Sequence, residues 1–179
     1  MKTSLGAKTL VFPTPTWIIG TYDKDGRPNA MAAAWGGICC SDPPCIAVSL
    51  RKATYSYGSL MDRKAFTVSV PSECHVKEAD YFGLVSGRDT NKFSATGLTP
   101  VKSGAVDAPY VGEFPLVLEC KIIGTNEIGL HTMFVGEIMG VKADPGCLTP
   151  EGKADMTKMK PFLYIPDTRA YHTLGDICG

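Results

Sequence analysis

Short runs of alternating apolar and polar residues dominate this chain, a pattern typical of β-strands that bury one face. The alternation predicts strands over residues 16–22, 29–38, 45–50, 65–70, 116–124, 130–141 and 161–165. Apolar residues at helical spacing predict short helices over residues 53–64, 76–86 and 91–96. Turn signals separate the elements, above all the segment Asp23–Pro28, where Asp-Gly is soon followed by Pro. We expect the tip of a second hairpin over 124–129, loops over 101–110 and 144–160, and only a short final segment over 171–175.

The order of these elements predicts the fold class. The strands come in hairpins, and the helices are inserted rather than alternating regularly with strands. This order excludes a doubly wound α/β sheet and favours a mainly β fold, an antiparallel barrel with a few short inserted helices. The length of 179 residues suits one domain, 1–179, with a core over about residues 10–175. Neither a dinucleotide-binding glycine motif nor a P-loop motif occurs.

Charge narrows the classes of partner. Lys plus Arg and Asp plus Glu both number 18, so no net field favours nucleic acid or an acidic membrane surface. No basic block is interleaved with aromatic residues, and we expect no nucleic-acid partner. Residues 1–10 lack the apolar centre of a signal peptide, and no apolar run approaches membrane-spanning length. We therefore expect a cytoplasmic protein with no membrane partner.

The seven cysteines predict free thiols rather than a disulfide framework, because their number is odd and no secretion signal accompanies them. Cys39 and Cys40 are neighbours in a predicted strand and would point to opposite faces, which disfavours joint metal binding. No Cys-x-x-Cys pair occurs, and we expect no metal site. Two interpretations of this pair remain: small strand residues beside a turn, or a redox dithiol.

The strand over 29–38 carries mostly small side chains, which allow a flat ligand to lie close to the backbone. Its edge offers N–H and C=O groups to the pyrimidine ring of a flavin. We expect the isoalloxazine of flavin mononucleotide (FMN) to lie on Asn29, Ala30, Met31 and Ala32. Trp35 either flanks this ring or belongs to the core.

Two polar clusters suit the phosphate of FMN. Ser49 and Arg51 lie two residues apart at the end of a strand and share one face, where a hydroxyl and a guanidinium can bind one phosphate. Arg51 could equally be an ordinary surface residue. Tyr55 and Ser56 begin the next predicted helix, whose free N–H groups either bind the phosphate or are simply capped.

The second cluster lies in the segment 86–92. Arg88 and Lys92 are four residues apart and would stack if this segment is helical, so that two cations could hold a phosphate dianion. Arg88 could instead pair with a carboxylate such as Asp89. Ser86 is a candidate hydroxyl donor to the phosphate or the ribityl chain.

Several segments, taken in order, resemble one protein family. They are Asp23–Asn29 with Met31 and Trp35, Asp42–Pro44, Ala47–Ser49, Phe66–Pro71, Ser86–Asp89 with Lys92–Phe93, Gly97–Thr99, Ala108–Pro109, Leu118–Cys120, His131–Thr132 and Gly136–Glu137. The chain resembles, from about Pro13 to Gly175, the flavin reductase-like, FMN-binding split-barrel proteins. The resemblance implies a Greek-key split barrel and a homodimer with FMN near its interface. It also implies electron transfer, or flavin reduction by NADH or NADPH; a non-catalytic flavin-binding module is the alternative.

Four further residues are candidates for the site. His131 would lie near the flavin, where an imidazole could buffer charge on the reduced ring, although a half-exposed structural histidine is the other interpretation. Cys40 and Ser41 occupy the turn after the small-residue strand, where Ser41 either donates to a flavin carbonyl or caps the turn. Tyr164 would approach a flavin across the dimer interface. A nicotinamide or a redox protein would be the electron donor.

We also expect the apolar stretches 12–19 and 162–165 to need cover beyond a single small barrel. A second copy of the chain would supply that cover.

Overall fold

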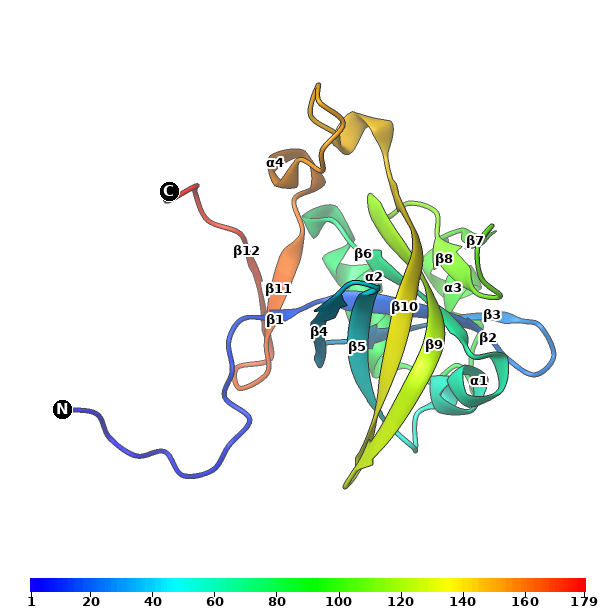
Figure 1. The fold of residues 1–179 in the computed structure, drawn as a ribbon, viewed down its shortest axis with the longest axis horizontal. Helices are drawn as coiled ribbons and strands as arrows, with labels where there is room; N and C mark the ends of the chain where they lie inside the picture. Colours follow the sequence, from blue (N-terminus) through cyan, green and yellow to red (C-terminus); the bar gives the residue numbers. More distant parts are fainter.

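The computed structural model describes residues 1–179 as an antiparallel barrel with peripheral helices (Figure 1). The strands are β1 (Thr14–Pro15), β2 (Trp17–Tyr22), β3 (Pro28–Ala33), β4 (Gly36–Ser41), β5 (Pro44–Arg51), β6 (Ala65–Val70), β7 (Pro100–Lys102), β8 (Pro109–Val111), β9 (Leu116–Ile128), β10 (His131–Ala143), β11 (Phe162–Ile165) and β12 (Ala170–Thr173). The helices are α1 (Tyr55–Arg63), α2 (Val76–Leu84), α3 (Lys92–Thr96) and α4 (Met156–Met159), with 3-10 turns η1 (Glu73–His75) and η2 (Pro145–Cys147). No helix is long and apolar enough to cross a membrane.

The main sheet has seven strands in the order β3-β2-β6-β9-β10-β5-β4, all antiparallel. Its first and last strands, β3 and β4, are joined by only Ala34 and Trp35. Three Cα steps span at most about 11 Å, so the two edges of the sheet must lie close together. A hydrogen bond from the Ser49 N–H to the Trp35 carbonyl, 2.8 Å long, ties this connection to β5. The sheet therefore curls into an open barrel, and the expected mainly β split-barrel class is confirmed.

Two expectations about strands were wrong. The run 29–38 is two strands rather than one, because the chain leaves the sheet edge at Ala34 and Trp35. The tip of the long hairpin is at Gly129 and Leu130 rather than over 124–129, because β9 continues to Ile128. Gly129 has φ +54°, a conformation that glycine adopts without steric cost.

Segments expected to be loops also contain regular structure. The small hairpin β7–β8 occupies the predicted loop 101–110, and η2 with α4 occupies the predicted loop 144–160. These elements are three or four residues long. They are too short to give a hydrophobic period that sequence alone would reveal.

The barrel interior is an apolar core, and its fully buried residues include Phe66, Val48, Ile19 and Phe134. A second core lies outside the barrel, where α2 and α3 cover β2 and β3. Ile18 and Ala30 from the strands meet Phe82 of α2 and Phe93 of α3 there. Ile18 and Ile19 thus point to opposite faces of one strand, as the strand geometry requires. Both faces of this part of the sheet are therefore buried.

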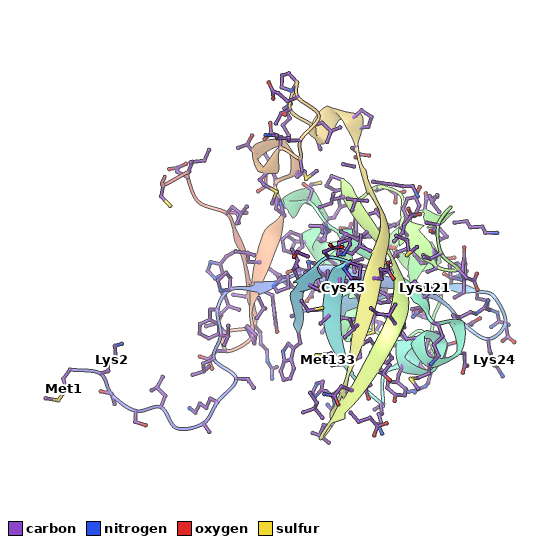
Figure 2. The ribbon with its side chains drawn as sticks, in the orientation of Figure 1. Met1, Lys2, Lys24, Cys45, Lys121 and Met133 are labelled. Atoms are coloured by element: carbon purple, nitrogen blue, oxygen red, sulfur yellow. The ribbon has the colours of Figure 1, made fainter.

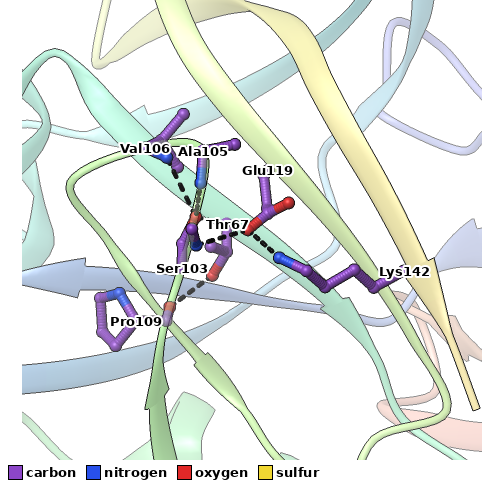
Figure 3. Close-up of polar contacts among 8 residues, drawn as sticks. Thr67, Ser103, Ala105, Val106, Pro109, Glu119 and Lys142 are labelled. Carbon is purple, nitrogen blue, oxygen red and sulfur yellow. Dashed lines mark hydrogen bonds and ion pairs between the residues drawn. The ribbon is translucent and has the colours of Figure 1, made fainter.

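A buried polar network holds the loop before β8 against the barrel (Figure 3). The Glu119 carboxylate accepts a bond of 2.5 Å from the Ser103 hydroxyl and one of 3.1 Å from the Gly104 N–H, and it pairs with the Lys142 ammonium. Thr67 donates to the Pro109 carbonyl at 2.5 Å. Glu119 is 3% exposed, so these partners replace the water that it loses.

A three-stranded sheet, β1-β11-β12, lies to one side of the barrel together with the extended N-terminal segment (Figure 1). One chain alone buries part of the stretches 12–19 and 162–165, and the expectation that another copy covers the rest stays a prediction. Ile18 and Ile19 are fully buried and Phe162 is 2% exposed, because helices and strands of the same chain pack on them. Phe12 remains exposed.

Candidate functional site

Three adjoining cavities form a groove between β3, the start of α1 and the end of α2. The central cavity has a volume of about 240 Å³ and shares Asn29 and Arg88 with a polar cavity of about 260 Å³. On its other side it shares Ala32 and Leu84 with an apolar cavity of about 200 Å³. We call these the central, polar and apolar cavities. The groove therefore changes from polar to apolar along its length.

The start of α1 lines the central cavity through Tyr55 and Ser56. The first N–H groups of a helix have no partner within the helix, so they are available to a ligand. The Thr54 side chain does not cap them, because its hydroxyl donates to the Arg51 carbonyl at 2.9 Å. The Asn29 amide donates to the Ser56 hydroxyl at 2.9 Å, which fixes β3 against the helix. This end of the groove can therefore accept an anion.

The loop after α2 faces the start of α1 across the central cavity. Ser86 and Arg88 line it, with Gly87 between them. A Cβ atom at Gly87 would collide with the Asn29 side chain and lie 2.7 Å from the Tyr55 ring, so only glycine allows this close approach. Arg88 donates to the Ala53 carbonyl at 3.1 Å, and its guanidinium lies 6.0 Å from the centre of the Tyr55 ring. The loop thereby brings a hydroxyl and a cation to the start of α1.

Asp23 fixes the outer wall of the polar cavity. Its carboxylate accepts hydrogen bonds from the Arg27 N–H at 2.8 Å and from the Tyr55 hydroxyl at 3.0 Å. Burial opposes ionisation, but the hydrogen bonds from Arg27 and Tyr55 outweigh it and lower the pKa of Asp23. Asp23 therefore stays ionised and positions the Tyr55 ring.

Lys92 forms part of the central cavity and is only 4% exposed. Its ammonium donates to the carbonyls of Ala30 and Phe82, both at 2.8 Å, and so ties β3 to α2. It has no carboxylate partner among the ion pairs of the chain. Desolvation lowers the pKa of Lys92 from 10.5 to about 8. An ammonium has three donor protons, so one is left for a ligand in the groove.

The apolar cavity is lined by Ala32, Ala33 and Ala34 on one side and by Tyr164 and Tyr171 on the other. The two tyrosine rings lie 5.2 Å apart between centres. The Tyr171 hydroxyl donates to Asp80 at 2.8 Å, and burial together with this bond raises the pKa of Tyr171.

Thr16 also lines the apolar cavity, and its hydroxyl oxygen is buried without a hydrogen-bond partner. Small side chains, two aromatic rings and one unpaired hydroxyl suit a flat ligand with a polar edge.

The structure divides the predicted site residues into groups. Those that line the groove are Asn29, Met31, Ala32, Tyr55, Ser56, Ser86, Arg88, Lys92 and Tyr164. Ala30 is fully buried in the second core, so only its carbonyl, bonded to Lys92, is near the groove. The condition for stacking of Arg88 on Lys92, a helix that contains both residues, is not met, because Asn91 caps a helix that begins only at Lys92.

Trp35, Ser49, Arg51 and His131 lie together outside the groove. Trp35 stacks on His131 with ring centres 4.6 Å apart, and β10 pairs His131 with Arg51. Trp35 is 43% exposed and Arg51 is exposed. Ala34 lines the apolar cavity, whereas the next residue, Trp35, lines none of the three cavities. We call these four residues the tryptophan cluster.

Cys40 and Ser41 form a third location, at the exposed β4–β5 turn, and line none of the three cavities. Sequence reasoning missed Thr16, Gly87 and the Tyr171–Asp80 pair. A glycine between Ser86 and Arg88 was a usable signal for close backbone approach. Nothing local marks Thr16 or Asp80, because tertiary packing alone brings them to the groove.

The fold is that of a split-barrel protein, and its groove has one polar and one apolar end. Comparison with known proteins identifies the class: the flavin reductase like domain matches residues 9–174. The chain therefore belongs to this family.

Solved structures and curated proteins agree with this assignment. The structure is similar to flavoredoxin of Desulfovibrio vulgaris (Miyazaki F), with 55% identity, a TM-score of 0.96, and coverage of 100% of this chain and 96% of that chain. It is also similar to flavoredoxin from Methanosarcina acetivorans, with 30% identity, a TM-score of 0.94, and coverage of 100% and 94%. An FMN reductase (NADH) of Bradyrhizobium diazoefficiens is 25% identical over 160 residues, which are 88% of this chain and 77% of that protein.

Proposed function

We propose that the groove binds FMN and that the protein passes electrons through the bound flavin. The observation that carries this proposal is the meeting of the α1 start, Ser86, Arg88 and Lys92 around one cavity. Helix N–H groups, a hydroxyl and two cations form the donor set that a phosphate dianion requires. The family supports a flavin-dependent redox function, and the names of two relatives refer to flavoredoxin and FMN reductase.

The residues present fit both ends of FMN. The phosphate would accept bonds from the start of α1, from Ser86 and Arg88, and from the remaining proton of Lys92. The isoalloxazine would lie on the alanines of the apolar cavity, flanked by Tyr164, with the unpaired Thr16 hydroxyl at hand for a ring heteroatom. The flavin would supply the redox chemistry, while the chain binds it, orients it and excludes water from one face.

Lys92 has a second consequence in this arrangement. Its ammonium lies in a desolvated position without a carboxylate partner. A dianion bound beside it restores the favourable electrostatics that burial removed, because opposite charges attract more strongly where water is excluded. The site therefore selects for the phosphorylated flavin over riboflavin.

Colour and reduction test the proposal. We expect the purified protein to be yellow, or to become yellow when FMN is added to the flavin-free protein. A colourless protein that fails to take up FMN contradicts the proposal. Under anaerobic conditions, prompt bleaching by NADH or NADPH identifies a reductase, whereas bleaching only by a reduced redox protein identifies an electron carrier. Stable binding without reduction by either donor identifies a flavin-binding module without turnover.

The tryptophan cluster bears on the proposed homodimer. Its residues were expected at the flavin, but within one chain they lie outside the groove. A second copy of the chain could bring its own Trp35 and His131 to the groove and cover the exposed part of the Trp35 ring. We expect light scattering to show a dimer, and we expect Trp35→Ala to weaken both the dimer and FMN binding. A monomer that holds FMN tightly contradicts this arrangement.

A further inference from the structure

The cysteines at the β4–β5 hairpin are not used by the proposed flavin site. This hairpin has Asp42 and Pro43 at its turn, with Ser41 opposite Pro44. The next pair outward is Cys40 opposite Cys45. Cys39 has no opposite residue, because the register shifts between Ile38 and Cys40. The adjacent pair in the sequence, Cys39 and Cys40, is therefore not the pair that the sheet brings together.

Directly opposite residues of antiparallel strands project to the same face of the sheet, with Cα atoms about 4.5 or 5.5 Å apart. A disulfide needs Cα atoms about 4.4–6.8 Å apart, so both kinds of pair satisfy this requirement. β4 is the last strand in the sheet order and pairs within the sheet only with β5. It can therefore adjust slightly without disturbing a second ladder.

We infer that Cys40 and Cys45 are a dithiol that low-molecular-weight disulfides convert into an intramolecular disulfide. The thiolate of exposed Cys40 attacks one sulfur of the incoming disulfide, whose other sulfur leaves as a thiol. The thiolate of Cys45 then attacks the sulfur of Cys40, and the second thiol leaves. The protein loses two electrons and two protons, and the incoming disulfide is reduced to two thiols.

The surroundings of the two thiols set the order of these steps. Cys40 is exposed, whereas Cys45 is 2% exposed. Burial raises the pKa of the Cys45 thiol, and the thiols of Cys40 and Cys39 raise it further. Cys40 is therefore the accessible nucleophile and Cys45 the resolving thiol. Figure 2 shows Cys45 on β5 within the barrel wall.

Other interpretations of the thiols find no support in the structure. No group of three or more His, Cys, Asp and Glu side chains converges to hold a metal ion. Cys120 is fully buried, and burial, with a smaller contribution from the Cys45 thiol, raises its pKa to about 12. It is therefore a poor partner for an external disulfide.

Thiol mapping in the full chain tests the inference. The reduced protein is incubated anaerobically with oxidised glutathione, denatured, alkylated and digested with trypsin. We expect two of the seven thiols to be lost, both in the tryptic peptide between Lys24 and Arg51, because trypsin does not cleave the Arg27–Pro28 bond. Survival of all seven thiols, or a disulfide between chains, overturns the inference. This experiment needs no variant and does not depend on bound flavin, so its outcome is independent of the proposed function.

Single substitutions identify the pair. Cys39→Ala is the matched control and keeps the disulfide, because Cys39 lies at the register shift. Cys40→Ala changes an exposed residue and prevents the disulfide. Cys45→Ala prevents it as well and leaves glutathione attached to Cys40, because the resolving thiol is missing. Loss of the disulfide in Cys39→Ala, or its persistence in Cys40→Ala, overturns the assignment.

Discussion

Replacing Lys92 separates the phosphate site from the rest of the flavin site. Lys92→Met keeps most of the apolar stem and removes the ammonium that lines the central cavity. A hydrogen bond to a charged group contributes about 1.5–3 kcal/mol. Because about 1.4 kcal/mol corresponds to a tenfold change in affinity, the affinity for FMN should fall roughly 10- to 150-fold. Riboflavin lacks the phosphate, so its affinity should change far less.

The riboflavin comparison also controls for structural damage. The same substitution removes the bonds to the Ala30 and Phe82 carbonyls, both 2.8 Å long, and leaves these buried acceptors unpaired. Any resulting distortion of β3 and α2 weakens the binding of FMN and of riboflavin alike. The assay is fluorescence titration of the flavin-free protein with each ligand. Lys77→Met, an exposed charge change on α2, is the matched control and should affect neither. Equal weakening of FMN and riboflavin by Lys92→Met would refute the phosphate contact.

The lowered pKa of Lys92 adds a dependence on pH with a definite sign. In the flavin-free protein Lys92 loses its proton near pH 8, whereas in an unfolded chain it does so near 10.5. Binding of the phosphate requires the protonated form, so FMN affinity should fall above about pH 8, by at most about tenfold per pH unit. Riboflavin binding to the wild type, and FMN binding to Lys92→Met, should show no such fall.

Folding stability should rise with pH, whereas FMN affinity should fall. Between about pH 8 and 10.5 the unfolded chain binds a proton that folded Lys92 has released, so stability rises with pH relative to Lys92→Met. Below about pH 8 both states are protonated, and the difference between the two proteins is constant. Urea unfolding of the flavin-free proteins at several pH values measures this difference. A falling difference over that window would contradict the desolvation argument.

Two further predictions concern the barrel. Glu119→Gln should lower the free energy of unfolding by about 1.5–3 kcal/mol near neutral pH, against little change for the exposed control Glu127→Gln. Desolvation opposes ionisation of Glu119, but the bonds from Lys142 and Ser103 outweigh it and lower the pKa of this carboxyl. The stability difference between wild type and Glu119→Gln is therefore complete above pH 4.5, the pKa in the unfolded chain, and disappears as the pH falls through the lower pKa of the folded protein. Gly136→Ala should cost about 1–3 kcal/mol, because the new Cβ lies 2.6 Å from the buried Phe66 ring. Gly37→Ala, with nothing within 4 Å, is its control, and equal unfolding midpoints would contradict the packing argument.

Local patterns predicted most of the barrel and nine of the residues that line the groove. The strand over 65–70 was predicted with its observed bounds, because alternation and the following Pro71 mark both ends. Asn29, Ser56 and Lys92 were expected at the cofactor, and all three line the central cavity. Polar residues beside the ends of strands and helices can be recognised in the sequence, and the ends of several elements meet at this cavity.

The closing of the sheet and the partners of Lys92 could not be predicted in the same way. The run 29–38 contains no Pro and no polar interruption that marks the break at Ala34 and Trp35. Lys92 was expected to bind only a phosphate, but it also bridges two backbone carbonyls. Backbone acceptors carry no sequence signal, so a lysine that fixes main chain looks the same as one that binds a ligand.

The two functions of Lys92 explain why the groove has its present form. By joining the carbonyl of Ala30 to that of Phe82, Lys92 holds β3 and α2 together at the central cavity, which lies between the polar and apolar cavities. Gly83 permits this closeness, because even a Cβ there would lie 3.2 Å from that of Ala32. An anion that binds the third ammonium proton is thus attached to the strand and the helix at once. Ligand binding and local stability should therefore be coupled, so FMN should protect α2 from hydrogen exchange more than riboflavin does.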